Sequence, residues 1–103
     1  MLAALYQNHP VFGDIAGNIA GVVEAVGNLN FDLLVLPELF ATGYQFKNRE
    51  EAYSLAEPAG AGYTYDRLAE LSGRKKALIV YGFPEKKGDR LYNSALAVLP
   101  DGS

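Results

Sequence analysis

The stretch Phe31-Asp32-Leu33-Leu34-Val35-Leu36, followed directly by Pro37-Glu38-Leu39-Phe40, decides the fold class of this chain. Residues 31–36 are apolar enough to be buried on both faces of a sheet, as strands of parallel α/β sheets are. Pro37 ends the strand because proline cannot donate to a strand ladder. Glu38 therefore follows the carboxyl end of a buried strand, where open α/β sheets place their functional sites.

Upstream of this stretch, the sequence predicts a strand followed by one amphipathic helix. Leu2 to Tyr6 is a short apolar segment typical of a buried strand. Asp14 stands at an N-cap position. The apolar residues after it recur at the spacing of one helical face: Ile15, Ile19, Val22, Val23 and Val26. Strand, helix and strand in this order predict a βαβ unit with parallel strands.

Downstream of Glu38, the sequence predicts two more helices. One is expected around Arg49 to Leu55. A linker-like break, Pro58-Ala59-Gly60-Ala61-Gly62, follows it. Thr64 is expected to cap the next helix, which would run from Tyr65 to about Ser72.

The last part of the sequence predicts a hairpin and then a second turn. Apolar strands are expected at Ala77–Phe83 and Leu91–Leu99, joined by the charged turn Lys86-Lys87-Gly88-Asp89. Pro100-Asp101-Gly102 then forms a turn, because proline presets φ and glycine supplies a positive φ. No strand follows this turn, so we interpret residues 1–103 as the N-terminal portion of a single α/β domain, truncated in the middle of its sheet. The alternative is a frayed natural C-terminus.

Composition excludes several classes of function. The 103 residues suffice for one small domain, and 50% are hydrophobic and 20% charged, as in globular proteins. A net charge of −3 argues against binding to nucleic acid or an anionic membrane. With no cysteine and one histidine, neither a thiol nucleophile nor a metal site is expected within these residues.

The sequence shows neither a secretory signal nor a membrane span. Residues 1–6 carry no basic residue, which a secretory signal needs. The longest apolar run elsewhere, Ala77–Phe83, is far shorter than the roughly 20 residues that cross a bilayer. We therefore expect a cytoplasmic protein with no membrane partner.

Glu38 is the candidate general base. Its neighbours in Leu36–Phe40 form an apolar setting that would desolvate the carboxylate and favour proton transfer. The alternative is a solvated loop glutamate. Glu85 also follows a proline at a strand end, but Lys86 and Lys87 come next, so we interpret Glu85 as a solvated turn charge.

Two further residues are candidates for supporting roles. Asn93 lies in an expected buried strand, so its amide needs hydrogen-bond partners. It would either fix a neighbouring loop or hold a catalytic side chain in place. Tyr44 follows Gly43 in the loop beyond Glu38 and would either line a substrate pocket or pack in the core or rim.

Residues 32–44, Asp-Leu-Leu-Val-Leu-Pro-Glu-Leu-Phe-Ala-Thr-Gly-Tyr, closely resemble the nitrilase superfamily of carbon–nitrogen hydrolases. Gln7 and the segment 13–18 are similar to the family's first strand and helix. Tyr81–Glu85, Leu91–Ala95 and Pro100–Gly102 are similar to its hairpin. The resemblance extends over essentially the whole chain.

This resemblance implies an α-β-β-α sandwich that hydrolyses the C–N bonds of small-molecule amides or nitriles without a cofactor. The family uses a cysteine nucleophile, a glutamate base, a lysine that stabilises the tetrahedral intermediate, and often a second glutamate. Of these, only the base has a counterpart here, Glu38; the others would lie beyond Ser103. The resemblance also implies a homo-oligomer.

The favoured hypothesis is an amidase of the ω-amidase or carbamoyl-amidase kind, and the glutaminase part of a larger synthetase is also compatible with these residues. The chain alone would be inactive, because it lacks the family's lysine and cysteine. The rival hypothesis is a non-catalytic truncated or split fragment that binds a partner.

Overall fold

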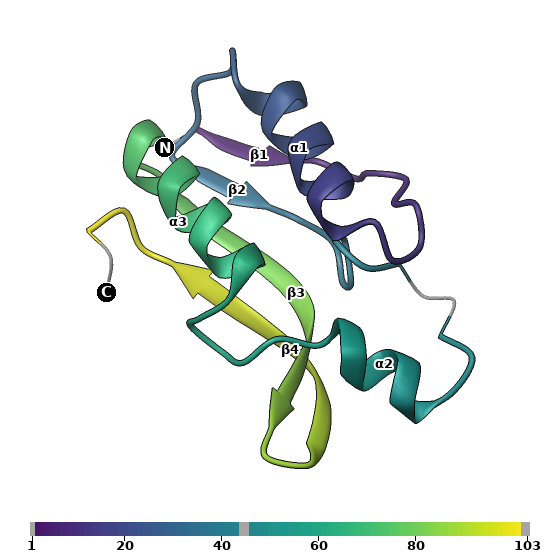
Figure 1. The fold of residues 1–103 in the computed structure, drawn as a ribbon. Helices are drawn as coiled ribbons and strands as arrows, with labels where there is room; N and C mark the ends of the chain where they lie inside the picture. The colour runs from purple at the N-terminus through teal and green to yellow at the C-terminus, as the bar shows by residue number, and fades with distance from the viewer. Residues whose placement is uncertain (1, 44–45, 102–103) are drawn as a thin grey trace.

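The chain folds into a four-stranded sheet with two helices on one face and a third helix beside the hairpin formed by the last two strands (Figure 1). The computed structural model describes residues 2–43 and 46–101. The strands are β1 (Ala3–Leu5), β2 (Leu33–Val35), β3 (Leu78–Lys87) and β4 (Arg90–Val98), and the helices are α1 (Ile15–Val26), α2 (Arg49–Leu55) and α3 (Tyr63–Lys75). The strand order is β1-β2-β3-β4, in which β1, β2 and β3 are parallel and β4 is antiparallel. The predicted α/β class and the βαβ unit are confirmed.

The two faces of the sheet differ in burial. Leu34 of β2 pairs with Ile79 of β3, and both side chains are fully buried beneath the helices. The neighbouring row, Leu5, Val35 and Val80, points to the other face, where Leu5 is 81% exposed. We call this second side the open face. The prediction that β2 is buried on both faces is therefore wrong for this chain, because the helices cover only one of them.

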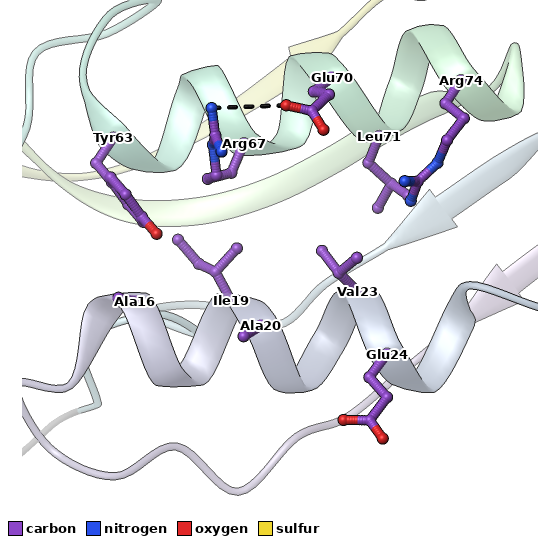
Figure 2. A pocket seen from close by; sticks show the side chains of 10 residues that line it. All are labelled: Ala16, Ile19, Ala20, Val23, Glu24, Tyr63, Arg67, Glu70, Leu71 and Arg74. Carbon is purple, nitrogen blue, oxygen red and sulfur yellow. Dashed lines mark ion pairs between the residues drawn. The ribbon is translucent and has the colours of Figure 1, made fainter.

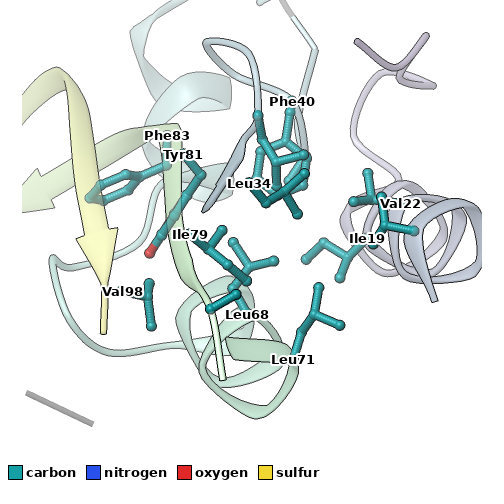
Figure 3. Close-up of a cluster of buried hydrophobic side chains, with 14 of the residues drawn as sticks. Ile19, Val22, Leu34, Phe40, Leu68, Leu71, Ile79, Tyr81, Phe83 and Val98 are labelled. Carbon is teal, nitrogen blue, oxygen red and sulfur yellow. The ribbon is translucent and has the colours of Figure 1, made fainter. Parts of the chain in front are cut away.

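The hydrophobic core lies between the sheet and the helices α1 and α3 (Figure 3). Its labelled members include Ile19 and Val22 of α1, and Leu68 and Leu71 of α3. Aromatic side chains pack together at one end of the core. The ring centroid of Tyr81 lies 6.1 Å from that of Phe40 and 5.3 Å from that of Phe83. Burial raises the pKa of the Tyr81 hydroxyl above its usual range, and the Glu57 carboxylate adds to the shift.

Helix α1 forms as the sequence predicts. The Asp14 carboxylate accepts a hydrogen bond of 3.1 Å from the backbone N–H of Gly17 and so caps the helix. At the other end, the Lys75 ammonium donates to the backbone carbonyls of Gly27 and Leu29, at 2.5 and 2.9 Å. Lys75 thereby ties the end of α3 to the loop that leads into β2.

Helix α3 begins and ends differently from the prediction. It starts at Tyr63 with Gly62 as N-cap, so Thr64 lies in the first turn and does not cap it. The Glu57 carboxylate instead accepts from the backbone N–H of Thr64, at 2.8 Å, and from its hydroxyl. Glu57 is separated from the helix by the turn at residues 58–62, so no local sequence pattern indicates that it caps α3. The helix also continues past Ser72 to Lys75.

Strand β3 is longer than predicted, because it passes through Pro84 to Lys87. The Pro84 carbonyl accepts a hydrogen bond from the Glu57 backbone N–H at 3.0 Å, and the Lys86 N–H donates to the Glu57 carbonyl at 3.0 Å. The Pro84 carbonyl therefore points towards Glu57 and away from β4. Because the backbone of Pro84 faces that side, its missing N–H removes no hydrogen bond from the β3–β4 ladder. Lys86 and Lys87 belong to the strand, and the turn is shorter than expected.

Candidate active site

Glu38 lies in the loop that follows β2, at the carboxyl end of the parallel strands. Leu39 and Phe40 turn their side chains into the protein, and Leu39 adopts a positive φ of 53°. Glu38 itself is exposed. The expected desolvation of its carboxylate by apolar neighbours is therefore not found in this chain, because Glu38 is exposed while Leu39 and Phe40 are buried.

Two asparagines fix the loop that carries Glu38. The Asn8 side-chain amide donates to the Phe40 carbonyl at 2.8 Å, and the Asn18 amide donates to the Ala41 carbonyl at 2.7 Å. Asn18 is only 8% exposed and also exchanges two hydrogen bonds with the backbone of Val11. This role of Asn18 was not predicted from the sequence. A signal was present, since Asn18 falls on the buried stripe of α1, where a polar side chain needs partners.

Asn93 brings the second strand of the hairpin to Glu38. Its side-chain amide donates a hydrogen bond to Oε1 of Glu38, across 55 residues of sequence. Asn93 lies opposite Pro84 in the β3–β4 ladder and is exposed, whereas the sequence predicted a buried strand position. Asn93 therefore holds a side chain of the loop after β2, and the catalytic role of that side chain stays a prediction.

Gly82 allows Glu38 to approach the sheet. A Cβ atom at residue 82 would lie 2.7 Å from the Cα of Glu38, closer than real Cβ atoms come. Only glycine leaves space for the loop to cross β3 at this distance. This role of Gly82 was not predicted, although a glycine inside an apolar strand is the usual signal of close backbone approach.

Glu38 and Asn93 share a hollow of about 260 Å³ over the sheet, whose other walls include Leu36, Val80 and Ala95. Another hollow, of about 320 Å³, lies between α1 and α3 on the helical side (Figure 2). Its rim carries the ion pair between Arg67 and Glu70, at 3.5 Å. None of the residues predicted to act in catalysis lines that second hollow.

Glu85 is not a turn charge. It lies within β3, is half-buried and accepts a hydrogen bond of 2.6 Å from the Ser94 hydroxyl. The prediction was wrong because the strand does not stop at Pro84.

Tyr44, the predicted pocket residue, lies outside the described residues. Among those described, no three His, Asp or Glu side chains are grouped to hold a metal ion, and no helix is long and apolar enough to cross a membrane.

The amino-acid sequence of this chain is similar to those of known enzymes. A nitrilase of Pyrococcus abyssi is 47% identical over 81 residues, which are 79% of this chain and 31% of that protein. An (R)-stereoselective amidase of a Pseudomonas species is 33% identical over 92 residues, covering 87% of this chain and 32% of the amidase. The chain thus spans about a third of the length of these relatives.

Solved structures agree with the sequence comparisons. The crystal structure of an N-terminal amidase matches 95% of this chain and 25% of its own length, with a TM-score of 0.85 and 25% identity. A CN-hydrolase superfamily protein of Xanthomonas campestris matches 94% of this chain and 36% of its own length, with a TM-score of 0.80 and 26% identity. The sequence model described as Carbon-nitrogen hydrolase matches residues 2–103, and this chain therefore belongs to the carbon–nitrogen hydrolase family.

Proposed function

We propose that Glu38 is the general base of an amidase that hydrolyses the C–N bond of small amides. One observation carries the proposal: a carboxylate at the end of the parallel strands is oriented by the Asn93 amide beside an open hollow. A general base must reach the proton it takes, and an exposed, oriented carboxylate can do so. Membership of the family, and relatives named as nitrilase and amidase, support C–N hydrolysis.

The nucleophile of this reaction would be a cysteine from outside these 103 residues, which contain none. Glu38 accepts the thiol proton as the sulfur bonds to the amide carbon, and it passes that proton to the nitrogen as the C–N bond breaks. The products of this half-reaction are a thioester and a free amine or ammonia. Glu38 then takes a proton from water, whose oxygen displaces the sulfur, and returns the proton to the thiolate.

Asn93 acts in this proposal by positioning. Its amide donates to Oε1 of Glu38 and so fixes the carboxylate in one orientation through both half-reactions. Tyr44 stays a predicted pocket residue.

The test is a kinetic comparison of two carboxylates in the protein expressed from the complete reading frame that contains this chain. Glu38→Gln keeps size and hydrogen-bond acceptor and removes the base, so kcat/KM for amide hydrolysis should fall about 10²–10⁴-fold. Glu85→Gln is the matched control, because Ser94 can still donate to the new amide oxygen. We expect it to lower kcat/KM far less, with circular dichroism confirming the fold of both variants.

Two results would contradict the proposal. One is an equal loss of activity in the two variants. The other is ammonia release by the 103-residue chain alone above that of its Glu38→Ala variant, since a chain without a thiol cannot form the thioester. If the folded protein from the complete reading frame hydrolyses no amide, a non-catalytic interaction module becomes the better hypothesis.

A further inference from the structure

We propose that an apolar recess beside Glu38 binds an uncharged hydrocarbon substituent of the amide substrate. The inference rests on the proposed function and narrows its substrate class. The recess has a volume of about 290 Å³, and its walls are Leu39, Phe46, Ala52, Pro84, Leu91 and Tyr92. Asn93 also lines it.

The recess continues the hollow that contains Glu38. The β3–β4 register places Ala95 opposite Gly82, Asn93 opposite Pro84, and Leu91 opposite Lys86. Alternate residues of a strand share a face, so Ala95, Asn93 and Leu91 form one row on the open face. Asn93 lines both hollows. An amide whose carbonyl lies at Glu38 can therefore direct its substituent along this row towards Leu91.

The walls of the recess are tied together by hydrogen bonds between α2 and the hairpin turn. The Tyr53 hydroxyl donates to the Gly88 carbonyl at 2.6 Å, and the Arg49 guanidinium donates to the Asp89 carbonyl. The Lys86 ammonium also lies 5.4 Å from the centre of the Tyr53 ring. These contacts hold Ala52 of α2 facing the hairpin, so the recess exists before any ligand enters it.

The lining selects against charge. Among the described residues, those that line the recess carry aliphatic or aromatic side chains, apart from the neutral amide of Asn93. A carboxylate transferred into such a site would lose its hydration without gaining a cationic partner from the wall. A short alkyl chain gains by the same transfer. The recess therefore favours an aliphatic amide over an amide with an acidic tail, such as the substrate of an ω-amidase.

The test compares three amides in the protein expressed from the complete reading frame: acetamide, pentanamide and glutaramate. Pentanamide adds three methylene groups to acetamide, so we expect its kcat/KM to be at least about tenfold higher. Glutaramate, which has a carboxylate at the end of a similar chain, should be the poorer substrate of the two longer amides. Ala52→Leu fills the recess and should lower the ratio of pentanamide to acetamide kcat/KM about tenfold. Ala25→Leu, at an exposed position of α1, should leave that ratio unchanged.

Binding separates this inference from the proposed function. Pentanamide should shift the ¹H–¹⁵N resonances of Leu91, Tyr92 and Asn93 in the same protein, at concentrations where acetamide does not. If those resonances shift but no amide is hydrolysed, the proposed function fails and the recess stands. The inference is overturned if they do not shift, if glutaramate is the preferred substrate, or if Ala52→Leu leaves the ratio unchanged.

Discussion

The hydrogen bond from the Asn93 side-chain amide orients the carboxylate of Glu38. Glu38 is exposed, and an exposed glutamate samples several rotamers whose loss opposes a fixed orientation. The Asn93 amide offsets this loss with a hydrogen bond to an ionised acceptor, which is stronger than a bond between neutral groups. The carboxylate can therefore be in place before a ligand arrives.

This contact predicts a graded response at residue 93 in the protein from the complete reading frame. Asn93→Ala removes the donor, and we expect kcat to fall about 10- to 100-fold with little change in KM. Asn93→Asp keeps the shape but places a second carboxylate beside Glu38, so the fall in kcat should be larger. Steady-state kinetics on one amide measures both constants.

Ser94→Ala supplies the control for this prediction. It removes the equivalent hydrogen bond to the other carboxylate, Glu85, and should lower kcat less than either change at Asn93. A fall in kcat as large as that of Asn93→Ala would show that the hairpin, not the orientation of Glu38, controls the rate.

At the scale of elements, the loop after β2 can lie close to β3 because residue 82 is a glycine and has no side chain. Gly82→Ala would place a Cβ 2.7 Å from the Cα of Glu38, so backbone must move to accommodate it. Overpacking of this kind typically destabilises a fold by about 1–3 kcal/mol. We therefore expect denaturant unfolding to show a loss of this size.

Gly21→Ala is the matched change in a helix. A Cβ at residue 21 of α1 would meet nothing within 4 Å, and alanine is favoured over glycine in a helix interior. The same glycine-to-alanine substitution should therefore stabilise the protein by up to about 1 kcal/mol. If both variants shifted the unfolding free energy in the same direction, the close approach at Gly82 would not be the cause.

Local patterns in the sequence predicted those elements whose determinants are local. Helix α1 is one case, since its cap at Asp14 and its apolar stripe are both contiguous in sequence. Helix α3 and strand β3 were predicted with wrong bounds, because Glu57 contacts both from outside: its side chain caps α3 and its backbone pairs with β3. The spacing of apolar residues along the sequence does not indicate such a contact.

The candidate site divides in the same way. Glu38 was predicted as a candidate because a proline and a carboxylate after an apolar strand are contiguous in the chain. Its contact with Asn93 and its close approach to Gly82 depend on the strand register, which pairs residues far apart in sequence. The sequence left open whether Glu38 is desolvated or solvated, because its exposure depends on which way each loop side chain turns.

At the scale of the whole molecule, α1 and α3 cover one face of the sheet (Figure 1). The open face carries exposed apolar side chains. Leu5 and Leu99 are 81% and 41% exposed. At one border of the sheet, β4 has no strand partner on its outer edge within residues 2–43 and 46–101. Exposed apolar faces and free strand edges both favour association between chains. The homo-oligomer implied by the family resemblance stays a prediction.

We therefore expect the 103-residue chain alone to associate with itself or to be poorly soluble. Sedimentation velocity should show its mean mass rising with concentration. Ala97→Lys places a charge on the open face and on the edge strand β4, where lysine discourages strand pairing, so the rise should be reduced. Ala25→Lys adds the same charge to an exposed position of α1 and should leave the association intact. A monomer at all concentrations, with slow amide exchange along both edges of β4, would contradict this expectation. An equal effect of the two lysines would instead point to net charge as the cause, since only Ala97 lies on the sheet.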